Sequence, residues 1–294
     1  MNNKIGKVIW FTFKQVITSN WYALIFIMGI VGVLLSTQSD KIMGALFGSS
    51  ASAAGQAATV MTAKDATFML QFVIILILFL MILVYGANIA NSIVEEKSGR
   101  IIETLLCYVK PLDLLAGKIV GYLLAIIMEI AIWVGYYLIL DVLLELPANP
   151  IFAALGALQP QVYVFLAASI IFGFMMYAFA FAALSSYADN AQDSTQLMFP
   201  VTIVIMIAYF LSLAIMNGMD GTWAQIIAKA PFFSPIVTFV TSDLIALTWK
   251  EVGINLAIQL VEVIVVAAIC AKFYRRGVVS YGLKKMSFKK LLGK

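Results

Sequence analysis

The chain has 294 residues, of which 63% are hydrophobic and only 12% are charged, and its mean hydropathy is +1.01. This composition lies far outside the range of soluble domains and indicates a protein built in lipid. The sequence contains no histidine. This excludes zinc sites with histidine ligands, Ser-His-Asp and Cys-His nucleophiles, and imidazole proton relays. The net charge of +4 needs no nucleic-acid partner, because basic residues also gather where anionic lipid headgroups lie.

Residues 1–20 predict an amphipathic helix that lies in the cytoplasmic headgroup layer. Apolar residues recur at spacings of three and four, with lysines on the other side. The apolar set is Ile5, Val8, Ile9, Phe13 and Val16, and the lysines are Lys4, Lys7 and Lys14. The segment has no compact apolar core ending in small residues, so it is not typical of a cleavable signal. A flank of the first membrane span is the alternative interpretation.

Six apolar runs, the first of them short, predict helices that cross a bilayer, which takes about 20 residues each. They cover residues 21–35, 68–93, 116–140, 162–184, 197–216 and 252–271. None has the two-residue alternation of a barrel strand. The sequence therefore predicts an all-α polytopic membrane protein, with a single six-helix transmembrane domain at 21–294 and no large domain in the loop at 36–67.

The distribution of basic residues predicts that both termini are cytoplasmic, since Lys and Arg concentrate in inside segments. With this orientation, the outside segments hold only four of the 19 lysines and arginines: Lys41, Lys64, Lys229 and Lys250. The basic tail at 272–294 then lies inside, as do both cysteines, Cys107 and Cys270, so a disulfide on the outer face is not expected. We expect a multi-pass protein of a bacterial plasma membrane.

The segment 95–110 is the only charge-dense stretch between two long apolar runs. Gly99 is a poor helix residue and predicts a break after the second span. A short helix can follow from Arg100 to Leu106, and Pro111 suits the start of the next helix. Ile101, Ile102, Leu105 and Leu106 would form its apolar face, beside Glu103. The pattern predicts helix, elbow, short amphipathic helix, elbow, helix; an ordinary charged connector is the alternative.

No catalytic or nucleotide-binding site is predicted in this chain. The pair Gly117-Lys118 is followed by Ile119 and lacks the preceding glycine of a phosphate-binding loop. Glu95, Glu96 and Arg100 match the Glu-Glu-x-x-x-Arg signature of the intramembrane prenyl-protein proteases, but those enzymes also need histidines. Any use of ATP must therefore come through a second polypeptide docked on the cytoplasmic loops, and no metal site or bound cofactor is expected.

The sequence resembles the ABC-2 type permeases, the membrane subunits of one class of ABC exporters. The resemblance is carried first by residues 95–106, Glu-Glu-Lys-Ser-Gly-Arg-Ile-Ile-Glu-Thr-Leu-Leu, and by 110–118, Lys-Pro-Leu-Asp-Leu-Leu-Ala-Gly-Lys. Further similar segments are 183–193, 231–235 and 274–277. The chain looks closest to the branch of bacterial sodium-exporter permeases, although many members of that branch carry a large outer domain where this chain has only the 36–67 loop.

The resemblance implies an ABC-2 exporter fold and function. It implies a dimer of permeases, identical or paired with a relative, and two separate ATPase subunits that bind ATP and Mg²⁺. Segment 95–110 would be the coupling segment, with Glu95, Glu96, Arg100 and Glu103 making polar contacts with the ATPase or pinning the elbow. Residues 1–20 would form a connecting helix, and residues 218–233 short helices that dip back into the outer leaflet.

Two carboxylates lie near the middle of predicted spans, where an unpaired charge is costly. Glu129 is one; the other, Glu262, shares a helix face with Asn255 and Gln259. These residues either bond between helices or contact a cargo or ion in a cavity. An ion-coupled secondary transporter that uses Glu129 and Glu262 is therefore an alternative function, as is a non-transporting scaffold or immunity protein. The apolar spans favour an amphipathic or hydrophobic cargo such as a peptide, lipid or drug.

Overall fold

The computed structural model describes residues 2–18, 63–144, 158–218, 221–230, 232–241 and 248–279. Within these ranges the chain is helical apart from short turns, and no strand is present. The predicted first span at 21–35 lies outside the described residues, as do residues 36–62 of the predicted loop and the tail beyond residue 279. The predicted loop ends earlier than expected, because a helix already begins at Ala63.

The described residues form five long helices and four shorter ones. The long helices are α5 (Ala63–Ser98), α7 (Pro111–Leu144), α9 (Pro160–Ser185), α10 (Ala191–Met216) and α13 (Trp249–Val279). The shorter helices are α1 (Asn2–Ile17), α6 (Ile101–Tyr108), α11 (Gly221–Ala228) and α12 (Ser234–Thr241). Local sequence explains several boundaries, since Pro111 and Pro160 occupy first helical positions and the Asn190 side chain caps α10 by accepting from the Asp193 N–H at 2.8 Å.

Five described helices are long and apolar enough to cross a bilayer. The predicted spans at 68–93, 116–140, 162–184, 197–216 and 252–271 lie within them. The helices extend past the apolar runs: α5 continues to Ser98 and α13 to Val279, so the first part of the predicted basic tail is helical. The chain is an all-α polytopic membrane protein, as predicted.

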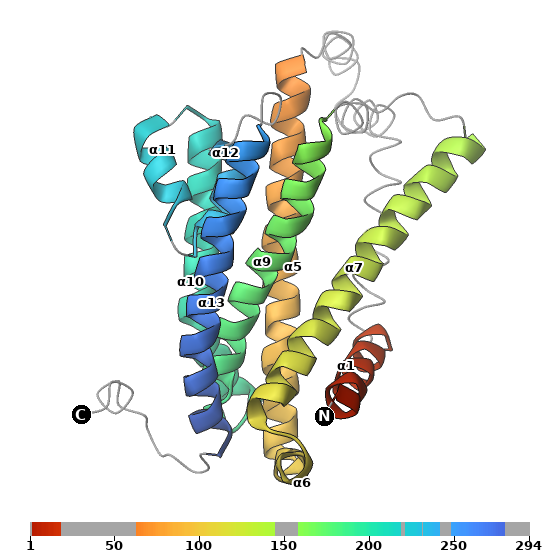
Figure 1. Ribbon diagram of the computed structural model, residues 1–294, viewed down its shortest axis with the longest axis vertical. Helices are drawn as coiled ribbons and strands as arrows, with labels where there is room; N and C mark the ends of the chain where they lie inside the picture. The colour runs from red at the N-terminus through yellow and green to blue at the C-terminus, as the bar shows by residue number, and fades with distance from the viewer. Residues whose placement is uncertain are drawn as a thin grey trace, which may run out of the picture.

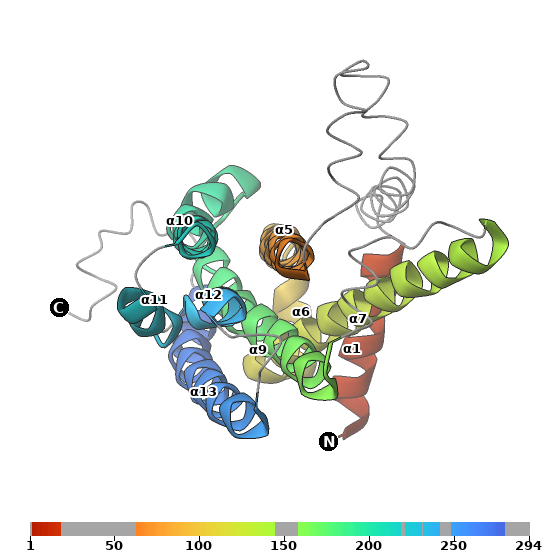
Figure 2. The same cartoon turned by 90° about the horizontal axis from the view of Figure 1, so that it is seen from above.

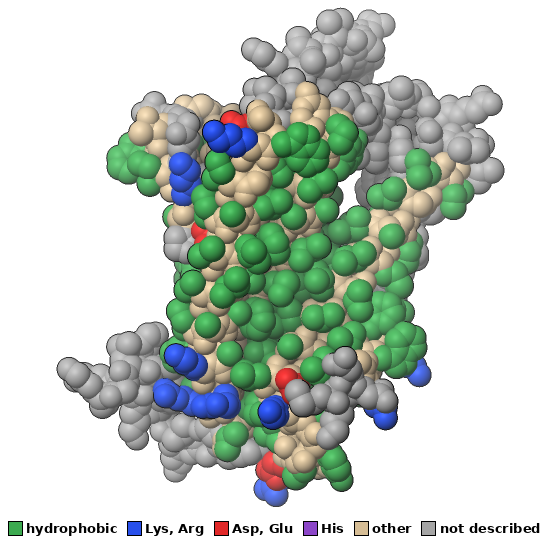
Figure 3. Space-filling view, viewed as in Figure 1, with side chains coloured by type: hydrophobic (Ala, Val, Ile, Leu, Met, Phe, Trp, Pro, Cys, Tyr) green, Lys and Arg blue, Asp and Glu red, His purple; other side chains and the backbone are tan. Residues whose placement is uncertain are grey.

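Figure 1 shows how these helices are arranged: α5, α9, α10 and α13 run side by side, while α7 leans away from them towards one end. The view from above in Figure 2 agrees, with α7 directed outwards from the bundle. Helix α6 lies at one end, which we call the α6 end, and the pair α11–α12 lies at the opposite end. Apolar side chains form a wide belt between the two ends, as expected of a surface that faces lipid (Figure 3).

Two apolar cores hold the bundle together. One packs α5, α9, α10, α12 and α13 around side chains such as Phe165, Tyr177 and Phe239. The other lies nearer the α6 end and packs α5, α6 and α7 with α1 and α9, around Ile89, Ile102 and Leu115. Helix α6 is therefore packed against the bundle, because its buried side chain, Ile102, is part of the second core.

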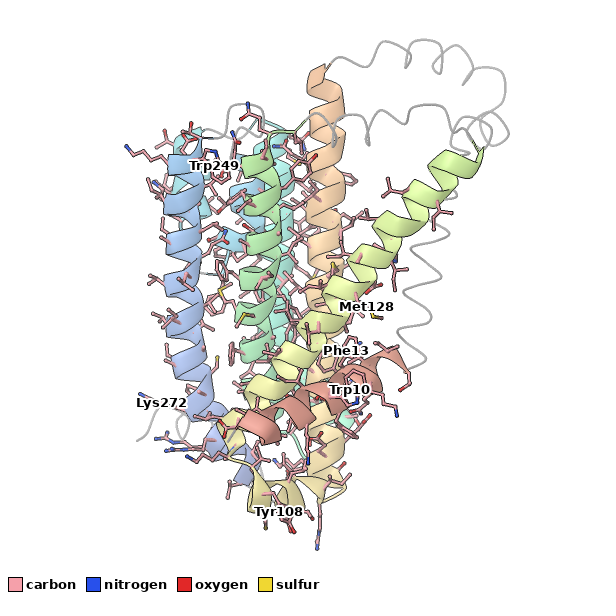
Figure 4. The ribbon with its side chains drawn as sticks, turned by 45° about the vertical axis from the view of Figure 1, so that its right-hand side comes forward. Trp10, Phe13, Tyr108, Met128, Trp249 and Lys272 are labelled. Atoms are coloured by element: carbon pink, nitrogen blue, oxygen red, sulfur yellow. The ribbon has the colours of Figure 1, made fainter. Side chains whose placement is uncertain are left out.

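Helix α1 crosses the lower part of α7, and two glycines let the backbones approach closely (Figure 4). A Cβ atom at Gly117 would lie 2.7 Å from Cγ1 of Val8, and one at Gly121 would lie 2.8 Å from Cβ of Thr12. Small residues at a spacing of four are typical of close helix packing in membranes. Trp10 and Phe11 are 66% and 64% exposed on α1, so aromatic rings remain free to enter the headgroup layer.

We expect Gly121→Leu to lower the thermal stability of the purified protein, because its side chain would collide with Thr12 and with the carbonyl oxygen of Ile9. Overpacking of this kind costs about 1–3 kcal/mol. Gly135→Leu, on the same helix, is the matched control, since a Cβ atom there meets nothing within 4 Å. Equal melting temperatures for the two variants in the same detergent would contradict the α1–α7 packing.

Candidate functional site

The segment between α5 and α7 has the predicted shape of a short helix between two elbows. Helix α5 ends at Ser98, and Arg100 takes the left-handed conformation with φ 56° before α6 begins at Ile101. Val109 is extended, with φ −133°, and α7 begins at Pro111. The short helix spans Ile101–Tyr108 rather than the predicted Arg100–Leu106. The residue with positive φ at the first elbow is Arg100, although Gly99 is the residue expected to break the helix.

The four apolar residues predicted to share one face of α6 do not do so. Ile102 is completely buried in the core with α5 and α7, and Leu105 and Leu106 are half-buried against it. Ile101 is instead 54% exposed, because it does not lie in the row of Ile102 and Leu106. Tyr108, which was not singled out, is 71% exposed. Helix α6 thus buries Ile102 and leaves Ile101 and Tyr108 on the surface.

Glu96 points into the protein and pairs with a buried lysine on α7. Its Oε2 lies 2.8 Å from Nζ of Lys118, which is 2% exposed and also donates to Oγ of Ser92 at 3.1 Å. This ion pair joins the end of α5 to the first turns of α7 and stays away from the surface. Glu95, Arg100 and Glu103 are exposed around α6. The predicted set therefore divides into one residue that braces the helices and three that remain available to a partner.

Lys97 ties α5 to the turn between α9 and α10. It is 1% exposed; its Nζ donates to the carbonyl oxygen of Ser186 at 2.9 Å and lies 3.2 Å from Oδ1 of Asp189. The Ser186 side chain also packs directly on Gly277 of α13. Lys97 and Lys118 together link the ends of α5, α7, α9, α10 and α13 beside α6. Both were missed, because their partners are distant in the sequence and no local pattern marks them.

Glu129 is 1% exposed and lies between α7 and α5, where its Oε2 accepts a hydrogen bond from the hydroxyl group of Tyr85. The Tyr122 hydroxyl group makes a second link between these helices by donating to the carbonyl oxygen of Asn88 at 3.2 Å. The other carboxylate oxygen of Glu129 and the indole N–H of Trp133 have no hydrogen-bond partner within the described part of the chain.

The predicted polar face of α13 lies against α9 and α12. Gln259 is 1% exposed, and both ends of its amide lack a hydrogen-bond partner among the residues that the structure describes. Glu262, half-buried, lies near the Ser234 hydroxyl group and Tyr177, and its Oε2 has no hydrogen-bond partner among the described residues. Asn255 is half-buried nearer the start of the helix. Glu262 and Glu129 face different helices, so the structure does not bring the two carboxylates into one site.

Tyr177 and Ser234, which the sequence analysis did not select, complete this cluster. The Tyr177 hydroxyl group donates to the carbonyl oxygen of Phe232, a residue held at φ 72° in the turn between α11 and α12. Within the predicted range 218–233 the structure has one short helix, α11. The second short helix, α12, begins just beyond this range, at Ser234. No group of three or more Cys, Asp and Glu residues that could hold a metal ion is found over the described ranges.

Comparison with known proteins identifies the family. The model of the family described as "ABC-2 family transporter protein" matches residues 35–272, more than half of the chain. The chain is 23% identical over 217 residues to "Uncharacterized protein YhaP" of Bacillus subtilis, covering 72% of this chain and 52% of the relative. It is 28% identical over 221 residues to "Uncharacterized protein MJ1024" of Methanocaldococcus jannaschii, covering 74% and 52%. The chain spans about half the length of these relatives. The sodium-exporter branch stays a prediction.

We expect Lys118→Met to destabilise the protein much more than Lys110→Met, because it leaves the Glu96 carboxylate without its cation while Lys110 is exposed. Removing one partner of a buried ion pair costs about 3–5 kcal/mol. Adding Glu96→Gln to Lys118→Met should restore part of the loss, since the unpaired charge is gone. Thermal unfolding of the four proteins in one detergent tests this, and strictly additive effects of the two substitutions would contradict the pairing.

Proposed function

This chain belongs to the ABC-2 transporter family, and from that premise we propose that it is the membrane-spanning permease subunit of an ATP-driven exporter. Proteins of this family are the membrane components of transport systems and work with ABC ATPase subunits, rather than being enzymes themselves. The chain would therefore contribute the transport path, while ATP and Mg²⁺ bind to its partner. The observation that carries the proposal is the construction of α6, which is exposed on one side and rigidly tied to the bundle on the other.

The exposed side of α6 supports a docking role. Ile101, Thr104 and Tyr108 are exposed at spacings of three and four, so they share one side of the helix, and Glu103 lies beside them. An aromatic anchor among smaller apolar contacts with a charged rim is typical of protein interfaces. Tyr108 lies at the extreme of the α6 end in Figure 4, where a soluble ATPase would meet it.

The buried side of α6 supports transmission of movement. A displacement of α6 acts on α5 and α7 through the adjoining elbows and through the pair Glu96–Lys118. It acts on the turn between α9 and α10 through Lys97. Closure of two ATPase subunits on ATP would thus tilt the helices as rods, a rigid-body change of the kind that packed helices allow. Glu96 and Lys97 serve this transmission, while Glu95, Arg100 and Glu103 serve docking.

The rest of the assembly follows the family pattern. We propose a dimer of permeases, identical or paired with a related chain, with two ATPase subunits below it. The α6 end would be cytoplasmic, together with both termini, because the inside segments then hold most of the basic residues. The complex would move an amphipathic or hydrophobic cargo outwards. Export of an ion such as sodium by the same mechanism is the alternative. The bacterial plasma membrane is the expected location.

The ion-coupled carrier is less well supported. Its two candidate ion ligands, Glu129 and Glu262, lie against different helices, and Glu129 is engaged by Tyr85. Bonding between helices explains both positions better than a shared ion site does.

We expect Ile101→Asp to abolish co-purification of an ABC ATPase with this protein. The change places a carboxylate in the middle of the proposed interface, on a side chain that is 54% exposed and belongs to neither apolar core. Val279→Asp is the matched control, because Val279 is 64% exposed at the α6 end of α13 and outside the interface. Gentle purification followed by mass spectrometry gives the ratio of the two chains.

Equal recovery of the ATPase with both variants would contradict docking through α6. Recovery of no ATPase with an intact wild-type complex would overturn the exporter proposal itself, and would direct attention to Glu129 and Glu262 as sites of an ion-coupled carrier.

We expect Lys97→Met to uncouple the end of α10 from the ATPase while leaving α7 coupled. Spin labels at Leu112 on α7 and at Gln192 on α10 would report ATP-dependent distance changes between identical positions of the two permeases, after the native cysteines are replaced. In Lys97→Met the change at Gln192 should be largely lost and that at Leu112 kept, since Glu96–Lys118 remains. Lys110→Met, which removes an exposed lysine, should keep both. Unchanged movement at Gln192 in Lys97→Met would contradict this route.

A further inference from the structure

Helix α13 has two sharply different faces. Its buried face carries Val263, Val266, Tyr274, Gly277 and Val278 and packs mainly on α9. The opposite face is apolar and open: Val261, Ile264, Val265 and Ile269 are each between 51% and 60% exposed. No described helix covers this face, and Figure 1 shows α13 at the outside of the bundle.

The open face has the length of a bilayer crossing. Trp249 is 57% exposed at the start of the helix, and Lys272 is exposed towards its other end. At 1.5 Å per residue these positions are about 34 Å apart, close to the hydrocarbon thickness with its boundaries. Figure 4 shows the two labelled side chains at opposite ends of α13. An aromatic ring at one boundary and a cation at the other are typical of a helix exposed to lipid.

Three cations continue the open apolar face at the α6 end. Lys272, Arg275 and Arg276 follow Ile269 at steps of three and four, and all three are exposed. The residues between and beyond them, Tyr274 and Gly277, are buried on the other side, which fixes the direction in which the cations lie. Figure 3 shows Lys and Arg side chains gathered at the lower end of the bundle, directly under the apolar belt.

These cations are not neutralised by carboxylates in the described part of the chain. Neither of the two ion pairs found there involves them, because Asp189 pairs with Lys97 and Glu96 with Lys118. The charge of Arg276 acts on Tyr187 in the turn after α9, where it opposes the rise in the phenol pKa caused by partial burial. Three positive charges therefore meet the membrane surface with no acidic partner among the described residues.

We propose that the α6 end of α13 is a binding site for one anionic phospholipid. The phosphate would bind between Lys272 and the adjacent guanidinium groups of Arg275 and Arg276, which suit the geometry of a phosphate. An acyl chain would lie along Val265 and Ile269 on the same face. The continuity between the cations and the apolar stripe favours a lipid over free phosphate or an acidic protein, because only a lipid uses both parts. The inference needs the membrane location of the chain but not its partnership with an ATPase.

The site is tested with the full-length protein in nanodiscs of phosphatidylcholine alone or mixed with phosphatidylglycerol. The triple variant Lys272→Gln, Arg275→Gln, Arg276→Gln removes the cations. The triple variant Lys7→Gln, Lys14→Gln, Lys110→Gln is the matched control. It removes two exposed lysines of α1 and the exposed lysine between α6 and α7, with the same change in net charge. The measurements are thermal stability in each nanodisc, the number of lipids retained in native mass spectrometry, and the affinity for phosphatidylglycerol titrated into the protein in detergent.

We expect phosphatidylglycerol to stabilise the wild type and the control triple, and each to retain one anionic lipid per chain. The α13 triple should bind phosphatidylglycerol in detergent about a hundredfold more weakly, from the usual contribution of three basic residues near an anionic surface. Equal weakening in both triples would overturn the site in favour of general surface charge. Stabilisation of the wild type by inorganic phosphate in phosphatidylcholine nanodiscs, to the same extent, would overturn the lipid in favour of a simple anion site.

Discussion

Burying a charged lysine in a helical membrane protein is costly unless the charge is paired, and two paired lysines join the helices at the α6 end of this bundle. Lys118 requires Glu96, and Lys97 requires Asp189 and the carbonyl oxygen of Ser186. Each pair joins two separate parts of the bundle: Glu96–Lys118 joins α5 to α7, and Lys97–Asp189 joins α5 to the turn between α9 and α10. Because separating a buried pair costs about 3–5 kcal/mol, these contacts favour joint movement of the helix ends. Joint movement of the helix ends is what the proposed coupling of α6 to an ATPase requires.

The opposite end of the bundle is joined differently, by neutral or weakly paired groups. The Tyr177 hydroxyl group bonds to the carbonyl oxygen of Phe232, which has a positive φ, and Glu262 lies near the Ser234 hydroxyl group. Gln259 is buried there, yet its amide has no hydrogen-bond partner among the described residues. Buried polar groups in native proteins are almost always bonded. This end is therefore one place where water, cargo, a second chain or a shift of α11 and α12 would gain hydrogen bonds.

Helix positions could be predicted because lipid imposes one requirement on every span, an apolar run of sufficient length. The same signal could not locate helix ends, since Glu95 to Ser98 and Lys272 to Val279 lie beyond the apolar runs but are still helical. At α6 the composition indicated an amphipathic helix, but two adjacent isoleucines with opposite environments cannot be told apart without the position of the core. Lys97 and Lys118 were missed for a related reason: their roles depend on Ser186 and Glu96, and only the folded chain brings those partners close. Pro235, in contrast, is a local signal for the start of α12 that was available.

Helix α13 is constrained both by packing against the bundle and by contact with the membrane boundaries. On one side Gly277 packs on Ser186, the residue that accepts from Lys97, so movement of α5 reaches the end of α13. On the other side Trp249 and the cations from Lys272 onwards set the depth of the helix in the bilayer. Drawing such a cation into the hydrocarbon costs about 2.5–3.5 kcal/mol even by the lower measured scale, which opposes sliding along the helix axis. Tilting changes the depth of these groups far less. Under the proposed function, a push received at Ser186 would therefore tilt α13 rather than slide it, and the displacement would be greatest at the far end, beside α12, where unpartnered polar groups lie.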